Sequence, residues 1–167
     1  MASPNLLLAR LQYDLENTVK GCLPTNKDLI ILFIEDNEAP RQVWLKFIQE
    51  TWSKESRAVR STFKAKSLIA REDFQPHLVL HDCKPVEMED DFDDTEGNSE
   101  AGNQLYSFFV EHNLPVVILT GDQADTVLTR EPYRTNPPLG ILSKPLDEEK
   151  FYLAVKLYCD HLAGSGA

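Results

Sequence analysis

The sequence predicts an α/β fold in which five strands form a mostly parallel sheet with helices on both faces. Short apolar runs alternate along the chain with longer amphipathic stretches, which is the order expected for a parallel sheet. The run at 28–34 is almost continuously apolar, as in a strand that is buried on both faces. Several apolar runs end in polar residues, and such sheets carry their sites at the carboxyl ends of the strands.

Five apolar runs are the predicted strands, and the segments between them are the predicted helices. The strands are expected at residues 28–34, 57–63, 78–82, 115–120 and 140–144. The helices are expected at residues 5–20, 38–52, 67–72, 102–112 and 148–162. Three prolines disfavour a regular helix before the last strand, because proline lacks the amide hydrogen that a helix interior needs: Pro132, Pro137 and Pro138.

The domain organisation is simple, because a chain of 167 residues is long enough for one sizeable core. We predict a single domain at residues 28–162. Residues 1–27 are interpreted as an extra N-terminal helix followed by a linker, and residues 163–167 as a disordered tail. The leucine stripe of the N-terminal helix favours packing on the core, and a homodimer or partner contact stays open as an alternative.

The net charge of −10 argues against a nucleic-acid-binding surface. Eight of the acidic residues fall in one segment: Glu87, Glu89, Asp90, Asp91, Asp93, Asp94, Glu96 and Glu100. The rest of the chain is therefore nearly balanced, and we predict a solvated acidic loop insertion at 84–100. A calcium-binding EF-hand loop is the alternative, but, counted from Asp91, no glycine occupies the sixth position and no glutamate the twelfth.

The cysteines and the apolar runs indicate a cytoplasmic protein. Cys22, Cys83 and Cys159 are widely spaced and form neither a zinc pattern nor a disulfide framework. The apolar run at 29–34 is far too short to span a bilayer, and the N-terminus shows no secretory signal. We therefore expect no membrane association.

The polar residues that end the predicted strands form a chemically specific set. Glu35 and Asp36 follow the strand at 28–34, and Asp82 ends the strand at 78–82. Thr120 and Lys144 end the next two strands. Mg²⁺ would offset the repulsion between clustered carboxylates, and a carboxylate beside it can attack phosphorus. The hydroxyl and the ammonium would then hold the phosphoryl oxygens.

Four segments resemble motifs of response-regulator receiver domains, and they occur in the same order. They are LFIEDNE, PHLVLHD, LPVVILTG and GILSKP, within a similarity that spans residues 28–162. The resemblance implies a flavodoxin-like, doubly wound fold with the strand order 2-1-3-4-5. It also implies a phosphoacceptor signalling domain rather than a conventional enzyme, with a downstream protein as its target.

The resemblance assigns a role to each residue of the set. Asp82 would accept a phosphoryl group from a histidine kinase or phosphotransfer protein, with Thr120 and Lys144 contacting the phosphoryl oxygens. Pro145 would follow a cis peptide bond. The Mg²⁺ ligands would come from Glu35, Asp36, Asp82 and the backbone carbonyl near Lys84.

The chain departs from the receiver pattern at positions that matter for signalling. Pro85 lies three residues after Asp82, where receivers usually place it four after, and the acidic insertion follows. We expect residues 84–100 to change order on binding Mg²⁺ or phosphate. Ile141 replaces the aromatic residue or histidine that usually moves with Thr120, so an altered signalling route is expected.

Two other functions remain alternatives. A pseudo-receiver would use the same fold as a protein-binding module without phosphorylation. The segment LTGDQADT is also similar to a loop of phosphatase-like hydrolases, but the nucleophile motifs of those enzymes are missing around Asp82.

Overall fold

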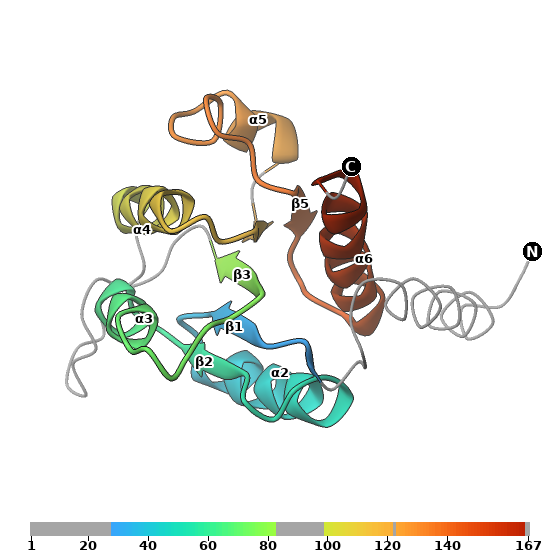
Figure 1. The fold of residues 1–167 in the computed structure, drawn as a ribbon. Helices are drawn as coiled ribbons and strands as arrows, with labels where there is room; N and C mark the ends of the chain where they lie inside the picture. The colour runs from blue at the N-terminus through green and yellow to red at the C-terminus, as the bar shows by residue number, and fades with distance from the viewer. Residues whose placement is uncertain (1–27, 83–98, 122, 166–167) are drawn as a thin grey trace, which may run out of the picture.

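The computed structural model describes residues 28–82, 99–121 and 123–165. Its five strands are β1 (Ile31–Ile34), β2 (Arg57–Val59), β3 (Leu78–Asp82), β4 (Val116–Thr120) and β5 (Gly140–Ser143). Every neighbouring pair is parallel, and the order across the sheet is β2-β1-β3-β4-β5 (Figure 1). The predicted fold class and strand order are therefore confirmed. The predicted N-terminal helix and most of the acidic insertion, including Lys84, lie outside the described residues.

Helices cover both faces of the sheet. They are α2 (Glu38–Thr51), α3 (Thr62–Ile69), α4 (Ser99–Glu111), α5 (Ala124–Leu128) and α6 (Glu148–Ser165). Helices α2 and α6 pack on one face, and α3 and α4 pack on the other (Figure 1). None of the described helices is both long and apolar enough to cross a membrane.

Strand β1 shows why its sequence is apolar throughout. Ile31 and Phe33 point into the core beneath α2 and α6, whereas Leu32 and Ile34 point into the core beneath α3 and α4. All four side chains are fully buried. A strand with helices on both faces has no solvent-facing positions, so alternation with polar residues is absent.

An aromatic cluster joins α2 to α6. The Trp52 ring, at the end of α2, stacks on Phe151 with centroids 6.1 Å apart and an interplanar angle of 28°. Phe47 and Tyr152 meet the same indole edge-on, at 5.8 Å and 5.7 Å. Trp52 is only 1% exposed, so this cluster is a large part of the core on that face.

The boundaries around α3 correct the sequence prediction. The strand predicted at 57–63 ends at Val59, and the helix predicted at 67–72 occupies Thr62–Ile69 instead. Ser61 decides this, because its hydroxyl accepts a hydrogen bond from the Lys64 amide at 3.1 Å and caps the helix. The alternation of polar and apolar residues from which a strand was predicted at 57–63 therefore runs into the first turn of α3, which Ser61 caps.

Two further boundaries are also corrected. Helix α4 begins at Ser99, so the last two residues of the predicted acidic loop are helical. Helix α6 continues to Ser165, so residues 163–165 are not part of a disordered tail. The proline-rich stretch behaves as expected, since α5 is only five residues long and ends before Pro132.

We expect Ser61→Ala to lower the free energy of unfolding by about 1 kcal/mol, because it removes the cap of α3. Ser67→Ala is the matched control in the same helix. The Ser67 hydroxyl donates to the Phe63 carbonyl at an exposed position, so its loss should change little. Urea unfolding of both variants measures the difference, and equal effects would show that Ser61 does not cap α3.

Candidate functional site

Three carboxylates meet at the carboxyl edge of the sheet. Glu35 and Asp36 directly follow β1, and Asp82 is the last residue of β3. One carboxylate oxygen from each lies within 4.8 Å of the others. The expected proximity of Asp36 and Asp82 is therefore observed, and all three side chains come from one edge.

The pairing of β1 with β3 brings these residues together. Ile34 pairs with His81, so the residues that follow them, Glu35 and Asp82, also lie side by side. The Glu35 amide donates to the Val59 carbonyl at 3.0 Å, which extends the backbone of β1 along β2. The Glu35 carboxylate accepts a hydrogen bond from the Asn37 amide at 3.1 Å. The first acidic residue is thus fixed at both its backbone and its side chain.

Lys144 joins the cluster from the other side. Its Nζ lies 3.0 Å from Asp82 Oδ2 and 3.3 Å from Glu35 Oε2. Its amide donates to the Thr120 carbonyl at 2.8 Å, which places it at the end of β5 beside β4. The peptide bond between Lys144 and Pro145 is cis, as the sequence resemblance implied. The predicted contact of this ammonium with Asp82 is direct.

Two basic residues that sequence reasoning missed hold the backbone around the site. Arg41 Nη1 donates to the carbonyls of Glu35 and Asp36, at 3.1 Å and 3.3 Å. Lys150 Nζ donates to the carbonyls of Ser143 and Pro145, both at 2.7 Å. Each lies in the first turns of the helix that follows a site loop, and that position is the only signal the sequence offers.

Thr120 lies at the same edge, on β4 opposite Ser143 of β5, and is 3% exposed. It lines a hollow of about 490 Å³ between β5 and the start of α5. Ile141 forms part of the wall of that hollow. Ile141, which stands where receivers usually have an aromatic residue or histidine, therefore borders the space next to Thr120.

Solved structures share this arrangement of strands and helices. The signal receiver domain of a putative LuxO repressor protein from Vibrio parahaemolyticus superposes with a TM-score of 0.62 at 15% identity, covering 83% of this chain and 95% of that one. The receiver domain of an HD domain-containing protein from Pseudomonas fluorescens Pf-5 superposes with a TM-score of 0.61 at 17% identity, covering 82% of this chain and 98% of that one. The non-phosphorylated HemR receiver domain from Leptospira biflexa gives 0.58 at 18% identity, with 79% and 94% covered. This chain has the receiver fold. No protein-family model and no curated protein sequence matches it.

The carboxylates of this receiver fold titrate unequally. Burial raises the pKa of Glu35 to about 7, and a hydrogen bond with Asp36 and the charge of Asp82 act in the same direction. Burial also acts to raise the pKa of Asp36, but its hydrogen bonds with Glu35 and Asp82 outweigh burial and lower it. The cluster therefore retains a proton on Glu35 close to neutral pH.

Lys144 responds to the same charges. Burial acts to lower its pKa, but the charges of Asp82 and Glu35 outweigh burial and raise it. The ammonium therefore stays protonated and offsets part of the negative charge of the cluster. Lys144 acts to lower the pKa of Glu35, but burial, the hydrogen bond with Asp36 and the charge of Asp82 outweigh it.

The donor set fits a magnesium ion. The three clustered groups offer only carboxylate oxygens, which Mg²⁺ prefers, and a divalent cation would replace the proton that Glu35 retains. Asp36, Asp82 and Glu35 are the residues that would hold it. The carbonyl near Lys84, which the resemblance added to this set, lies outside the described residues.

We expect Glu35→Gln to stabilise the metal-free protein at about pH 8 by on the order of 1–3 kcal/mol, with a smaller effect near pH 5. The pKa of Glu35 in the folded chain, about 7, lies above its ordinary value of 4.5. Its contribution to stability is therefore present at low pH and is lost as pH rises through 7. Glutamine keeps an oxygen for the Asn37 amide but never ionises.

Urea unfolding in EDTA at the two pH values measures this difference. Glu111→Gln, which removes an exposed carboxylate at the end of α4, is the control. If Glu35→Gln has the same effect at both pH values, Glu35 carries no raised pKa.

His81, next to Asp82, is a packing residue in this structure. It is fully buried, its Nε2 lies 3.2 Å from the Gly102 carbonyl, and its ring meets Phe109 edge-on at 5.5 Å. Burial lowers the pKa of His81 to about 4, so the ring is neutral at pH 7. It links β3 to α4 directly behind the acidic cluster.

Proposed function

We propose that this chain is a phosphoacceptor receiver of a two-component phosphorelay. In this proposal Asp82 accepts a phosphoryl group from a phosphohistidine, and the phosphorylated form changes the contacts that the domain makes with other proteins. The observation that carries the proposal is the geometry around Asp82. Its carboxylate contacts the Lys144 ammonium at 3.0 Å and lies within 4.8 Å of two further carboxylates at the carboxyl edge of the sheet.

Each residue of the site has a separate role in the proposed phosphoryl transfer. An oxygen of Asp82 forms the new bond to phosphorus as the bond from phosphorus to the donor imidazole nitrogen breaks, and that nitrogen takes up a proton. Lys144 offsets the charge on the phosphoryl oxygens, and the Thr120 hydroxyl donates a hydrogen bond to one of them. Mg²⁺, when bound by Glu35, Asp36 and Asp82, neutralises charge on the transferring group.

The proposed partners follow from this chemistry. A histidine kinase or a histidine phosphotransfer protein supplies the phosphoryl group, and a downstream protein reads the result. We further propose that the chain acts in the cytoplasm, without contacting nucleic acid. Acetyl phosphate replaces the kinase in a first test, because it presents a transferable phosphoryl group without a protein.

Incubation with acetyl phosphate and Mg²⁺, followed by intact-mass measurement, tests the proposal. The expected product is the chain plus one phosphoryl group, and EDTA should prevent its formation. A chain that stays unmodified, and that shows no change in hydrogen exchange with Mg²⁺ and beryllofluoride, would instead be a pseudo-receiver. Steady turnover of a generic phosphomonoester would point to a phosphatase-like hydrolase.

The pseudo-receiver is the second candidate because of one observation. Ile141, a β-branched residue without a polar tip, borders the space next to Thr120 and is a poor two-position switch. If phosphorylation occurs, we therefore expect its signal to leave by another route. Most of the acidic segment for which a change of order was expected, residues 84–98, lies outside the described residues.

We expect Lys144→Ala to weaken the response to phosphorylation more than it weakens folding. The Lys144 ammonium bridges Asp82 and Glu35, and in the proposed function it pairs with the phosphoryl group. Hydrogen exchange with and without Mg²⁺ and beryllofluoride should show most of the wild-type difference lost. Lys156→Ala, which removes an exposed ammonium paired with Asp160 on α6, is the control. A normal response in Lys144→Ala would remove this residue from the proposed mechanism.

A further inference from the structure

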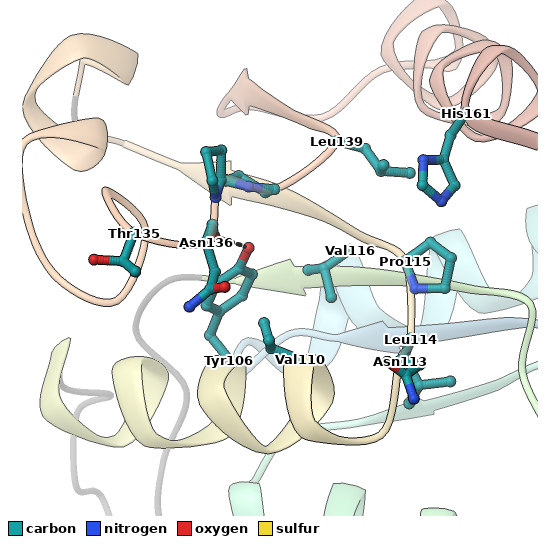
Figure 2. A pocket seen from close by; sticks show the side chains of 12 residues that line it. Tyr106, Val110, Asn113, Leu114, Pro115, Val116, Thr135, Asn136, Leu139 and His161 are labelled. Carbon is teal, nitrogen blue, oxygen red and sulfur yellow. Dashed lines mark hydrogen bonds between the residues drawn. The ribbon is translucent and has the colours of Figure 1, made fainter. Parts of the chain in front are cut away.

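An open hollow lies at the opposite edge of the sheet from Asp82. It is enclosed by α4, by the chain on either side of the start of β4, by the proline-containing chain that enters β5, and by the end of α6 (Figure 2). Its volume is about 440 Å³. The candidate phosphoryl site does not use this hollow, since the two lie at opposite ends of the parallel strands.

The wall of the hollow combines apolar side chains with neutral polar side chains and one histidine. Its apolar side chains include Val110, Leu114, Pro115, Pro137 and Leu139, four of them half-buried. Among the described residues that line it there is no lysine, arginine, aspartate or glutamate. Such a wall favours an uncharged occupant over a charged ligand, and its apolar side chains can accept part of an apolar helix face.

One polar group of the hollow is bonded within the chain. The Tyr106 hydroxyl donates to the Asn136 carbonyl at 2.6 Å, so it ties α4 to the chain before β5 (Figure 2). His161 lies at the rim, beside Leu139 and Pro115 (Figure 2). An occupant would gain by removing the apolar part of this wall from water.

The start of β1 lies at the same end of the sheet as this hollow. The Ile30 carbonyl accepts from the His77 amide at 2.8 Å, and the Pro115 carbonyl accepts from the Val79 amide at 2.9 Å. β1, β3 and β4 thus begin side by side, and two strand spacings of about 5 Å separate β1 from the wall of the hollow. The seven residues at 21–27 span at most about 23 Å when extended, which is enough to reach it.

Residues 5–20 have the sequence that such a wall would accommodate. Leu7, Leu11, Leu15 and Val19 recur every four residues, which places them on one face of the predicted helix. A single helix of this length is marginal in water unless it buries its apolar face. We propose that the leucine stripe of residues 5–20 docks in the hollow between α4 and the chain entering β5 of the same molecule.

Hydrogen exchange on the full chain tests the docking. The double variant Leu11→Ser with Leu15→Ser should speed exchange of amides in 106–116 and 135–140 by about tenfold, as a loss of about 1.4 kcal/mol produces. The matched control, Glu16→Gln with Asn17→Ser, alters the opposite face of the predicted helix and should leave these amides unchanged. Unchanged exchange in the leucine variant would overturn the proposal.

A reciprocal variant separates docking from a loss of folding. Leu114→Gln changes the wall of the hollow and should speed exchange within residues 5–20, while amides of β1 and β3 keep their protection. Protection of 106–116 that depends on protein concentration, with a dimer in light scattering, would assign the stripe to a second copy and overturn docking within one molecule. Protection that is independent of concentration, in a monomer, is the expected result.

Discussion

Replacing Asp82 with Asn should abolish incorporation of a phosphoryl group from acetyl phosphate. The amide has neither the charge nor the nucleophilic oxygen that attack on phosphorus requires. The change is nearly isosteric, and it removes one of the two carboxylates that contact Lys144, at 3.0 Å, together with a proposed ligand of Mg²⁺. The variant should therefore keep its fold but lose phosphorylation.

Intact mass after incubation with acetyl phosphate and Mg²⁺ measures the loss. Asp73→Asn is the control, because it removes the same charge at an exposed position, where Asp73 pairs with Arg71 at 2.8 Å. This control should be modified as fully as the wild type. Modification of Asp82→Asn at the wild-type level would place the phosphoacceptor elsewhere in the chain.

Replacing Trp52 with Ala should lower the free energy of unfolding by about 3–5 kcal/mol. The indole is 1% exposed and packs against three aromatic rings, so its loss leaves a cavity between α2 and α6. Domains of this size are stable by about 5–15 kcal/mol, so the variant should lie close to the limit of folding.

Urea unfolding followed by far-ultraviolet circular dichroism measures this cost. Val43→Ala, in α2 and 63% exposed, is the control and should change stability by less than about 0.5 kcal/mol. A cost for Trp52→Ala below about 1 kcal/mol would show that the aromatic cluster is not a main part of the core.

The bounds of the helices and strands could be predicted only where the local sequence marks them clearly. Strand β3 was predicted at its observed bounds, because it is a short apolar run with a defined start, and α2 was predicted within one residue, because it has a clear helical period. The start of α3 was wrong, since a serine cap and a short polar alternation look alike in sequence. Only the observed bond from the Lys64 amide to Ser61 distinguishes them.

The sequence by itself determined which edge of the sheet carries the site. Parallel strands end at one edge, so the acidic residues after β1 and at the end of β3 had to lie together. The observed cluster of Glu35, Asp36 and Asp82 confirms that reasoning. Their residue types also led to the prediction of an oxygen-liganded divalent ion, because carboxylates offer only oxygen donors.

Only the tertiary structure decided how these groups act on one another. The contacts of Lys144 with both Asp82 and Glu35 depend on the pairing of β5 with β4 and on the loops that Arg41 and Lys150 hold in place. The raised pKa of Glu35 depends first on burial, a property of the packed chain that no local pattern encodes. Electrostatic energies vary steeply with distance and with access to water, and both quantities exist only once distant segments have come together.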